Sequence, residues 1–97
     1  MNSGVHRKLC AALLRHIPNA RIEQTRERPW ASITFTGARH WLTLIVPTED
    51  AEAVARDLPE ANLPLVGHIV ADLAIMGKAH QPPCTALEIE ALTVEVC

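Results

Sequence analysis

Three side chains of this sequence have chemistry suited to binding a metal ion: His40, His80 and Cys84. Each histidine follows a glycine by three residues, Gly37 or Gly77, so each is expected to lie in a turn. Neutral imidazole and thiolate suit zinc, and three protein ligands leave one position open. The spacing lacks the tight ligand pairs of most zinc loops, and no carboxylate is near in sequence. We therefore favour the interpretation that these histidines are solvated loop residues, and keep the zinc site as the alternative.

Two further chemistries use the same residues. Cys84 could act as a nucleophile with His80 as its base. A reactive thiol needs a neighbouring cation or helix N-terminus, and only Lys78 is close in sequence. Arg39, His40 and His80 could instead bind a small ligand without catalysis. Because no catalytic motif is present, we favour an interaction or small-ligand binding module over an enzyme, and expect no cofactor other than that zinc.

A second candidate surface combines guanidinium groups with indoles. Its members are Arg26, Arg28, Trp30, Arg39 and Trp41. Such a surface can bind single-stranded nucleic acid through stacking and charge. Two tryptophans are few, however, and Glu23 and Glu27 balance the charge of Arg26 and Arg28. Single-stranded nucleic-acid binding is therefore a second alternative.

The elements that must position these residues follow from hydrophobic periodicity. Apolar residues at helical spacing, closed in each case by a proline, predict helices over 4–17 and 49–58. Alternating residues predict strands over 30–36 and 41–46, joined by a turn at 37–40.

The remaining segments are less regular. Residues 19–29 are polar and read as a loop or an edge strand, since a proline cannot donate to an interior ladder. Residues 68–76 suit a helix or a strand, and their β-branched content favours the strand. A loop is expected over 78–84 and a strand over 85–96. The apolar phase of this last strand switches at Ala91–Leu92, which predicts a β-bulge or burial on both faces.

The order helix–strand–strand occurs twice, and the residues indicate an internal repeat. Leu13–Ile22 matches Val54–Leu63 at an offset of 41, and Gly37–His40 matches Gly77–His80 at an offset of 40. An αββαββ order is a circular permutation of the ferredoxin-like βαββαβ plan. The predicted fold is therefore a single α+β domain over 1–97, a two-layer sandwich with two helices on one face of an antiparallel sheet.

This plan makes the strands that begin near His40 and Thr85 central neighbours, and it places both Gly-x-x-His turns at one end of the sheet. The predicted core is almost entirely aliphatic. Its members are Leu9, Leu13, Ile17, Ile33, Phe35, Leu42, Leu44, Val54, Leu58, Ile69, Leu73, Leu87 and Ile89.

Composition sets limits on function. The chain has 97 residues and a formal charge of −2, which does not favour general nucleic-acid binding. Residues 1–46 hold seven basic and two acidic side chains, whereas residues 47–97 hold two basic and nine acidic ones. Three cysteines without a C-x-x-C pair favour a reducing compartment. With no apolar run of membrane-spanning length and no secretory signal, we expect a cytoplasmic protein that does not associate with membranes.

The expected sheet has one face without helices, and its residues predict a partner. Two sets could occupy it: Trp30, Ser32 and Thr34 with Trp41, Thr43 and Ile45, or the late apolar run Leu92, Val94 and Val96. Those residues together would make an apolar patch that soluble monomers rarely leave exposed. We therefore predict a homodimer that buries this face. The alternative is a monomer in which the segment 19–29 folds over the patch.

Overall fold

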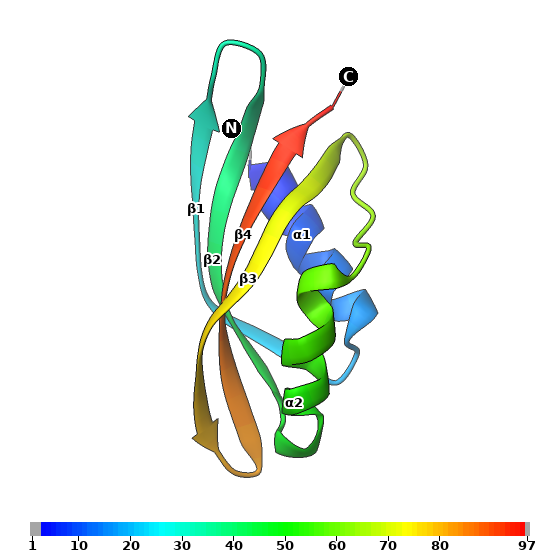
Figure 1. Ribbon diagram of the computed structural model, residues 1–97, viewed down its shortest axis with the longest axis vertical. Coiled ribbons are helices and arrows are strands. Elements are labelled where there is room, and N and C mark those ends of the chain that lie inside the picture. The colour runs from blue at the N-terminus through cyan, green and yellow to red at the C-terminus, as the bar shows by residue number, and fades with distance from the viewer. Residues whose placement is uncertain (1–2, 97) are drawn as a thin grey trace.

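The computed structural model describes residues 3–96 of the chain. In chain order its elements are α1 (Ser3–His16), β1 (Arg21–Ala31), β2 (Thr36–Pro47), α2 (Thr48–Asp57), the 3-10 turn η1 (Leu58–Glu60), β3 (His68–Gln81) and β4 (Cys84–Glu95). The strands form one antiparallel sheet, and both helices lie against the same face of it (Figure 1). The predicted α+β class is confirmed, and the arrangement is that of two layers. No helix within residues 3–96 combines the length and apolarity needed to cross a membrane.

The strand order is β1-β2-β4-β3. The central strands β2 and β4 pair from Gly37 opposite Val94 to Pro47 opposite Cys84, which confirms that they are neighbours. Because β2 and β4 run in opposite directions, the β1–β2 and β3–β4 hairpins turn at opposite ends of the sheet (Figure 1). The prediction that both Gly-x-x-His segments lie at one end is therefore wrong.

The first hairpin turns earlier than predicted. The Ser32 hydroxyl accepts a hydrogen bond from the Phe35 N–H at 3.1 Å, and the Ser32 N–H donates to the Phe35 carbonyl at 2.8 Å. These bonds close the turn at residues 32–35, so the predicted strand over 30–36 and turn over 37–40 are wrong. As a result Ile33 and Phe35 are 103% and 55% exposed and do not belong to the core.

The two glycines of the Gly-x-x-His segments lie inside strands. Gly37 belongs to β2, where a Cβ would overlap the carbonyl oxygen of Thr93 on β4. Gly77 belongs to β3, which continues to Gln81 where a loop was predicted. The two glycines thus occupy different strands and non-equivalent positions.

Two register shifts in β3 explain a second error in the predicted core. The pairing with β4 shifts between Val70 and Asp72 and again between Ile75 and Gly77. One extra residue reverses the facing of every side chain beyond it. Leu73 therefore points into the core, whereas Ile69 points away from the helices and is 52% exposed.

Of the two alternatives predicted for the last strand, burial on both faces fits better than a β-bulge in the strand itself. β4 pairs with β2 without interruption, and its alternate residues from Thr85 to Thr93 are all buried. Leu92 and Val94 lie on the opposite face, where they are half-buried. The bulge therefore lies opposite them in β3 and not in β4.

The core lies between the helices and the sheet and matches most of the predicted set. Leu9 and Leu13 of α1 pack with Leu42 and Leu44 of β2, and all four are at most 2% exposed. Each buried leucine contributes about 1.5–3 kcal/mol of transfer free energy. The other confirmed members are Leu58, Leu73, Leu87 and Ile89, with Ile17 and Val54 partly buried against them.

Candidate functional site

The sheet surface directed away from α1 and α2 is the most extensive candidate site, and we call it the open face. Within residues 3–96 no helix covers it (Figure 1). Strand alternation and the pairing register assign its side chains. They are Arg21, Glu23, Arg26, Arg28 and Trp30 on β1, Arg39, Trp41, Thr43 and Ile45 on β2, Ala86, Glu88, Glu90, Leu92 and Val94 on β4, and Ile69, Asp72 and Ala74 on β3.

Charge divides the open face into two halves. The β1–β2 half carries four arginines and Glu23, and the β4–β3 half carries Glu88, Glu90 and Asp72 without a basic residue. The hairpins are contiguous in sequence, so the basic N-terminal half and acidic C-terminal half of the chain become the two sides of one surface.

Three contacts order the middle of the open face. Arg39 pairs with Glu90 at 2.7 Å, and the Thr43 hydroxyl donates to Glu88 at 3.2 Å. The guanidinium carbon of Arg26 lies 4.2 Å from the centroid of the Trp41 ring, a cation–π contact. These side chains are therefore held in defined positions before any partner binds.

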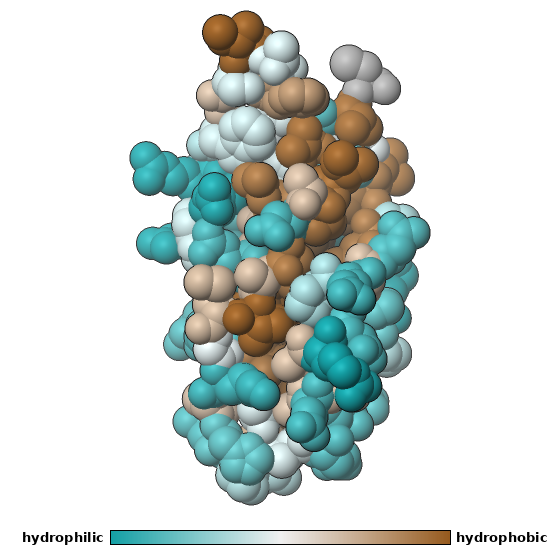
Figure 2. Space-filling model, in the orientation of Figure 1, coloured by the Kyte–Doolittle hydropathy of each residue, from teal (hydrophilic) through white to brown (hydrophobic). Residues whose placement is uncertain are grey.

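Apolar side chains lie among the charged groups on β2, β4 and β3, and we call them the apolar strip. Trp41, Ile45, Leu92 and Val94 are half-buried, and Ile69 is more than half exposed. Figure 2 shows hydrophobic residues gathered over the upper parts of β4 and β3, with hydrophilic residues projecting at the β1 edge on the left. An apolar strip flanked by charges is typical of a surface that binds another protein.

The register separates the residues first considered as metal ligands. His80 lies opposite Thr85 and accepts or donates a hydrogen bond with its hydroxyl at 3.2 Å, and Cys84 lies beside it at the same hairpin. His40 lies opposite Ala91, six positions further along β4. His80 and Cys84 thus lie in the same hairpin, but the register places their side chains on opposite faces of the sheet, and His40 lies elsewhere.

The residues considered for small-ligand binding also point in different directions. Arg39 lies on the open face, whereas its neighbour His40 points toward the helices and is fully buried. His80 lies at the far hairpin. The three side chains share no common pocket.

His40 has partners that sequence reasoning missed. Its Nδ1 lies 2.8 Å from Nδ1 of His6 on α1, and its Nε2 lies 2.9 Å from the hydroxyl of Thr93. Glu27 of β1 pairs directly across from His40. Burial, together with the positive charges that His6 and His68 can carry, lowers the pKa of His40 to about 4, so the buried ring is neutral near pH 7.

Cys10 lies near this group, one helical turn after His6. Burial raises the pKa of the Cys10 thiol, and the negative charge of Glu27 raises it further. Cys10 and Cys84 are free thiols, and Cys97 lies outside the described residues. Neither Cys10 nor His6 carried a motif, since the contacts depend on how α1 packs against the sheet.

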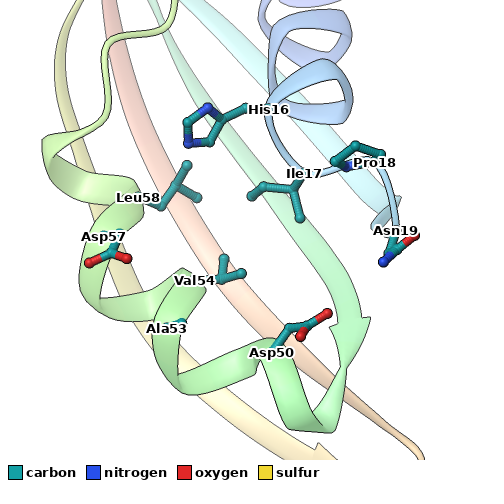
Figure 3. A pocket seen from close by; sticks show the side chains of 9 residues that line it. All are labelled: His16, Ile17, Pro18, Asn19, Asp50, Ala53, Val54, Asp57 and Leu58. Carbon is teal, nitrogen blue, oxygen red and sulfur yellow. The ribbon is translucent and has the colours of Figure 1, made fainter.

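A hollow of about 310 Å³ lies between the end of α1 and α2. Figure 3 shows Ile17, Val54 and Leu58 lying between the two helices, with Asp50 at one end. Asp57 pairs with its neighbour Arg56 at 2.9 Å. The hollow therefore has an apolar floor, with the polar side chains of His16, Asn19, Asp50 and Asp57 around it.

Comparisons with protein-family models, with curated proteins and with solved structures find no match to this chain. Its function is therefore inferred from its own residues.

Proposed function

We propose that this domain is a non-catalytic interaction module whose open face binds the open face of a second copy. One observation carries the proposal: a single uncovered sheet face is divided into a basic half and an acidic half, with apolar side chains among the charges. A two-fold pair buries such a strip, because the same patch meets itself. The outcome is a homodimer with four strands from each copy in its interface.

Charge decides the orientation of the pair. A two-fold axis parallel to the strands places β1 and β2 of one copy over β4 and β3 of its partner, so each basic half meets an acidic half. An axis perpendicular to the strands, within the plane of the sheet, would place arginines over arginines and carboxylates over carboxylates. Because like charges across an interface repel, we propose the first arrangement.

The edges of the sheet favour pairing through the face. A flat exposed edge strand is a template for another strand. Here β1 has a register shift between Glu23 and Arg26 and contains Pro29, and β3 has two register shifts. These irregularities hinder the pairing of either edge strand with a strand of another molecule, so the open face is the better docking surface.

The size of the open face suits a weak to moderate dimer. Four strands spaced about 4.8 Å apart, over about eight residues at 3.3 Å, cover roughly 500 Å² per copy. The pair would bury about 1,000 Å² in total, near the lower limit for a specific interface. We therefore expect self-association at tens of micromolar.

The same arginines and tryptophans were considered for single-stranded nucleic acid. On the open face Arg26 covers the Trp41 ring, and Arg39 is neutralised by Glu90. The indole nitrogen of Trp30 is buried. Arg26, Arg39 and the Trp30 indole nitrogen are thus engaged within the face and Arg28 is not, while the adjacent acidic half repels a polyanion, which favours a protein partner.

We also propose that the two α–β–β halves form a repeat on a permuted ferredoxin-like plan. The element order, the central position of β2 and β4, and the edge positions of β1 and β3 support it. The match between Leu13–Ile22 and Val54–Leu63 supports it further, because residues of both segments pack against the core. The Gly-x-x-His match does not contribute, since its glycines lie in non-equivalent strands.

Sedimentation equilibrium tests the proposed function. At tens of micromolar and low salt we expect a species of twice 10.6 kDa. Salt at 1 M should weaken the dimer, because it screens the contacts between the charged halves. A single species of 10.6 kDa at all concentrations up to 100 µM, or a complex with a single-stranded oligonucleotide in place of the dimer, would overturn the proposal.

A charge-swap experiment tests the orientation. Arg28 and Asp72 are exposed on the two outer strands and belong to no ion pair within residues 3–96. We expect Arg28→Glu or Asp72→Lys alone to weaken the dimer about tenfold, since each change occurs twice in a two-fold pair. The double variant should recover most of the affinity. If either single change strengthens the dimer, like halves face each other and the proposed axis is wrong.

A further inference from the structure

The contact between α1 and the sheet holds a cluster of side chains from three elements. His6 of α1, Glu27 of β1 and His40 of β2 place their nitrogen and carboxylate oxygen atoms within 4.8 Å of one another. Two of them are half-buried, and His40 is fully buried. We infer that these three residues form a binding site for a divalent transition metal ion, with zinc as the best-fitting case.

The two imidazoles present nitrogen atoms to each other. Their Nδ1 atoms are 2.8 Å apart, while the ring planes differ by only 15° and the centroids are 5.1 Å apart. The rings therefore meet edge to edge through their nitrogens and are not stacked face to face. Only one of the two facing nitrogens can carry a hydrogen in such a contact, so at least one lone pair points into the gap.

Thr93 fixes the tautomer of His40. The Thr93 hydroxyl donates to the carbonyl oxygen of Ala38 at 3.3 Å, so its oxygen is free to accept from the Nε2–H of His40 at 2.9 Å. With the proton on Nε2, the Nδ1 of His40 is a lone-pair donor. Metal-binding histidines are commonly held in this way, with one nitrogen free for the metal and the other bonded to a fixed acceptor.

The remaining groups of the cluster lack partners in the described part of the chain. The Nε2 of His6 is buried without a hydrogen bond among residues 3–96. Glu27 enters none of the ion pairs found there. Zinc at Nδ1 would leave that Nε2 as it is, so the ligand set is indicated by the unpaired Glu27 carboxylate beside the two facing Nδ1 atoms.

The ligand types indicate the class of metal. Two neutral imidazoles and one carboxylate suit zinc and related first-row divalent ions, not the all-oxygen sites of calcium or magnesium. Tetrahedral zinc with bonds of about 2.0–2.1 Å spaces two nitrogens about 3.3 Å apart. The Nδ1 atoms need to separate by only about half an ångström to reach that spacing. Three protein ligands would leave a fourth position for water.

The test is calorimetric titration of the full chain with zinc chloride after treatment with a chelator. We expect one zinc per chain, with shifts of the His6 and His40 imidazole signals in NMR spectra and none at His80. Glu27→Gln keeps the size of the side chain and removes the anionic ligand, so it should weaken zinc binding by about tenfold or more. Glu23→Gln is the matched control: it lies on the same strand but on the open face, and should bind zinc like the parent protein.

The outcomes separate the site from its alternatives. His6→Gln should also weaken binding, and it provides a second variant if Glu27→Gln alters the circular dichroism spectrum. His80→Gln should have no effect. The inference is overturned if no zinc binds, if Glu27→Gln and His6→Gln bind as tightly as the parent chain, or if His80→Gln is the variant that loses binding. The last result would restore the hairpin of His80 and Cys84 as the site.

Discussion

Val94→Glu is expected to convert the dimer to a monomer of 10.6 kDa in sedimentation equilibrium. Val94 is half-buried on the open face, between Gly37 of β2 and Ile69 of β3. In the proposed pair, two introduced carboxylates would lose their water without gaining a counter-charge, which is costly. We expect the dissociation constant to rise by more than about 100-fold.

The chain offers a matched control for this substitution. Val66 is 81% exposed and precedes β3, outside the open face. Val66→Glu introduces the same charge at a valine but should leave the dimer intact. If Val66→Glu dissociates the dimer as strongly as Val94→Glu, the effect comes from net charge and the open face is not the interface.

Folding should survive the Val94 substitution, because this side chain points away from the helices. The core on the other side of β4 is formed by Leu87, Ile89 and Ala91, which the change does not touch. The circular dichroism spectrum of Val94→Glu should therefore match that of the parent chain. A monomer with an altered spectrum would instead indicate that the face stabilises the domain itself.

Hydrophobic periodicity was sufficient to predict which segments form helices or strands and that β2 pairs with β4 at the centre of the sheet. The stripe through Leu9 and Leu13 requires a helix, and the alternation through Leu42 and Leu44 requires a strand with one face inward. These patterns depend on residues close in sequence. The pairing of β2 with β4 then follows from having two helix–strand–strand units in one sheet.

The position of the first turn and the facing of Ile69 were predicted wrongly, because in each case a single residue changes the course of the backbone. The sequence predicts a turn at Gly37, whereas the side chain of Ser32 closes the hairpin through hydrogen bonds to Phe35. A regular strand predicts Ile69 and Leu73 on one face because they are four residues apart, but the bulge between Val70 and Asp72 reverses that relation. Neither a serine turn nor a bulge has a reliable signature in a single sequence.

The histidine cluster could not be found from spacing. His6 and His40 are 34 positions apart and meet only because α1 packs across β2. Glu27 joins them because the β1–β2 register places it opposite His40. Sequence reasoning selected His40 for its Gly-x-x-His context, which led to His80 and Cys84 as partners. Strand alternation predicted Trp41, Thr43 and Ile45, or Leu92 and Val94, for the open face, and the register places both groups there.

Gly37→Ala should destabilise the domain more than any other change to a single glycine. A Cβ at this position would overlap the carbonyl oxygen of Thr93 and would lie 3.0 Å from the indole nitrogen of Trp30. The indole can move, but the carbonyl belongs to the β2–β4 pairing at the centre of the sheet. Relief therefore requires the two central strands to separate near Ala38 and Thr93.

We expect Gly37→Ala to lower the free energy of unfolding by about 3 kcal/mol, the upper end of the range for overpacking, which corresponds to roughly 12–24 °C in Tm. Gly77→Ala is the matched control, because its Cβ would meet Glu88 Cγ at 3.8 Å, an ordinary contact. That variant should stay within about 0.5 kcal/mol of the parent chain. Urea unfolding at one protein concentration measures both. Equal stability of the two variants would mean that β2 and β4 do not approach as closely at Gly37 as the structure indicates. The hydrogen bond between Thr93 and His40 spans the same two strands, so it would then be in doubt as well.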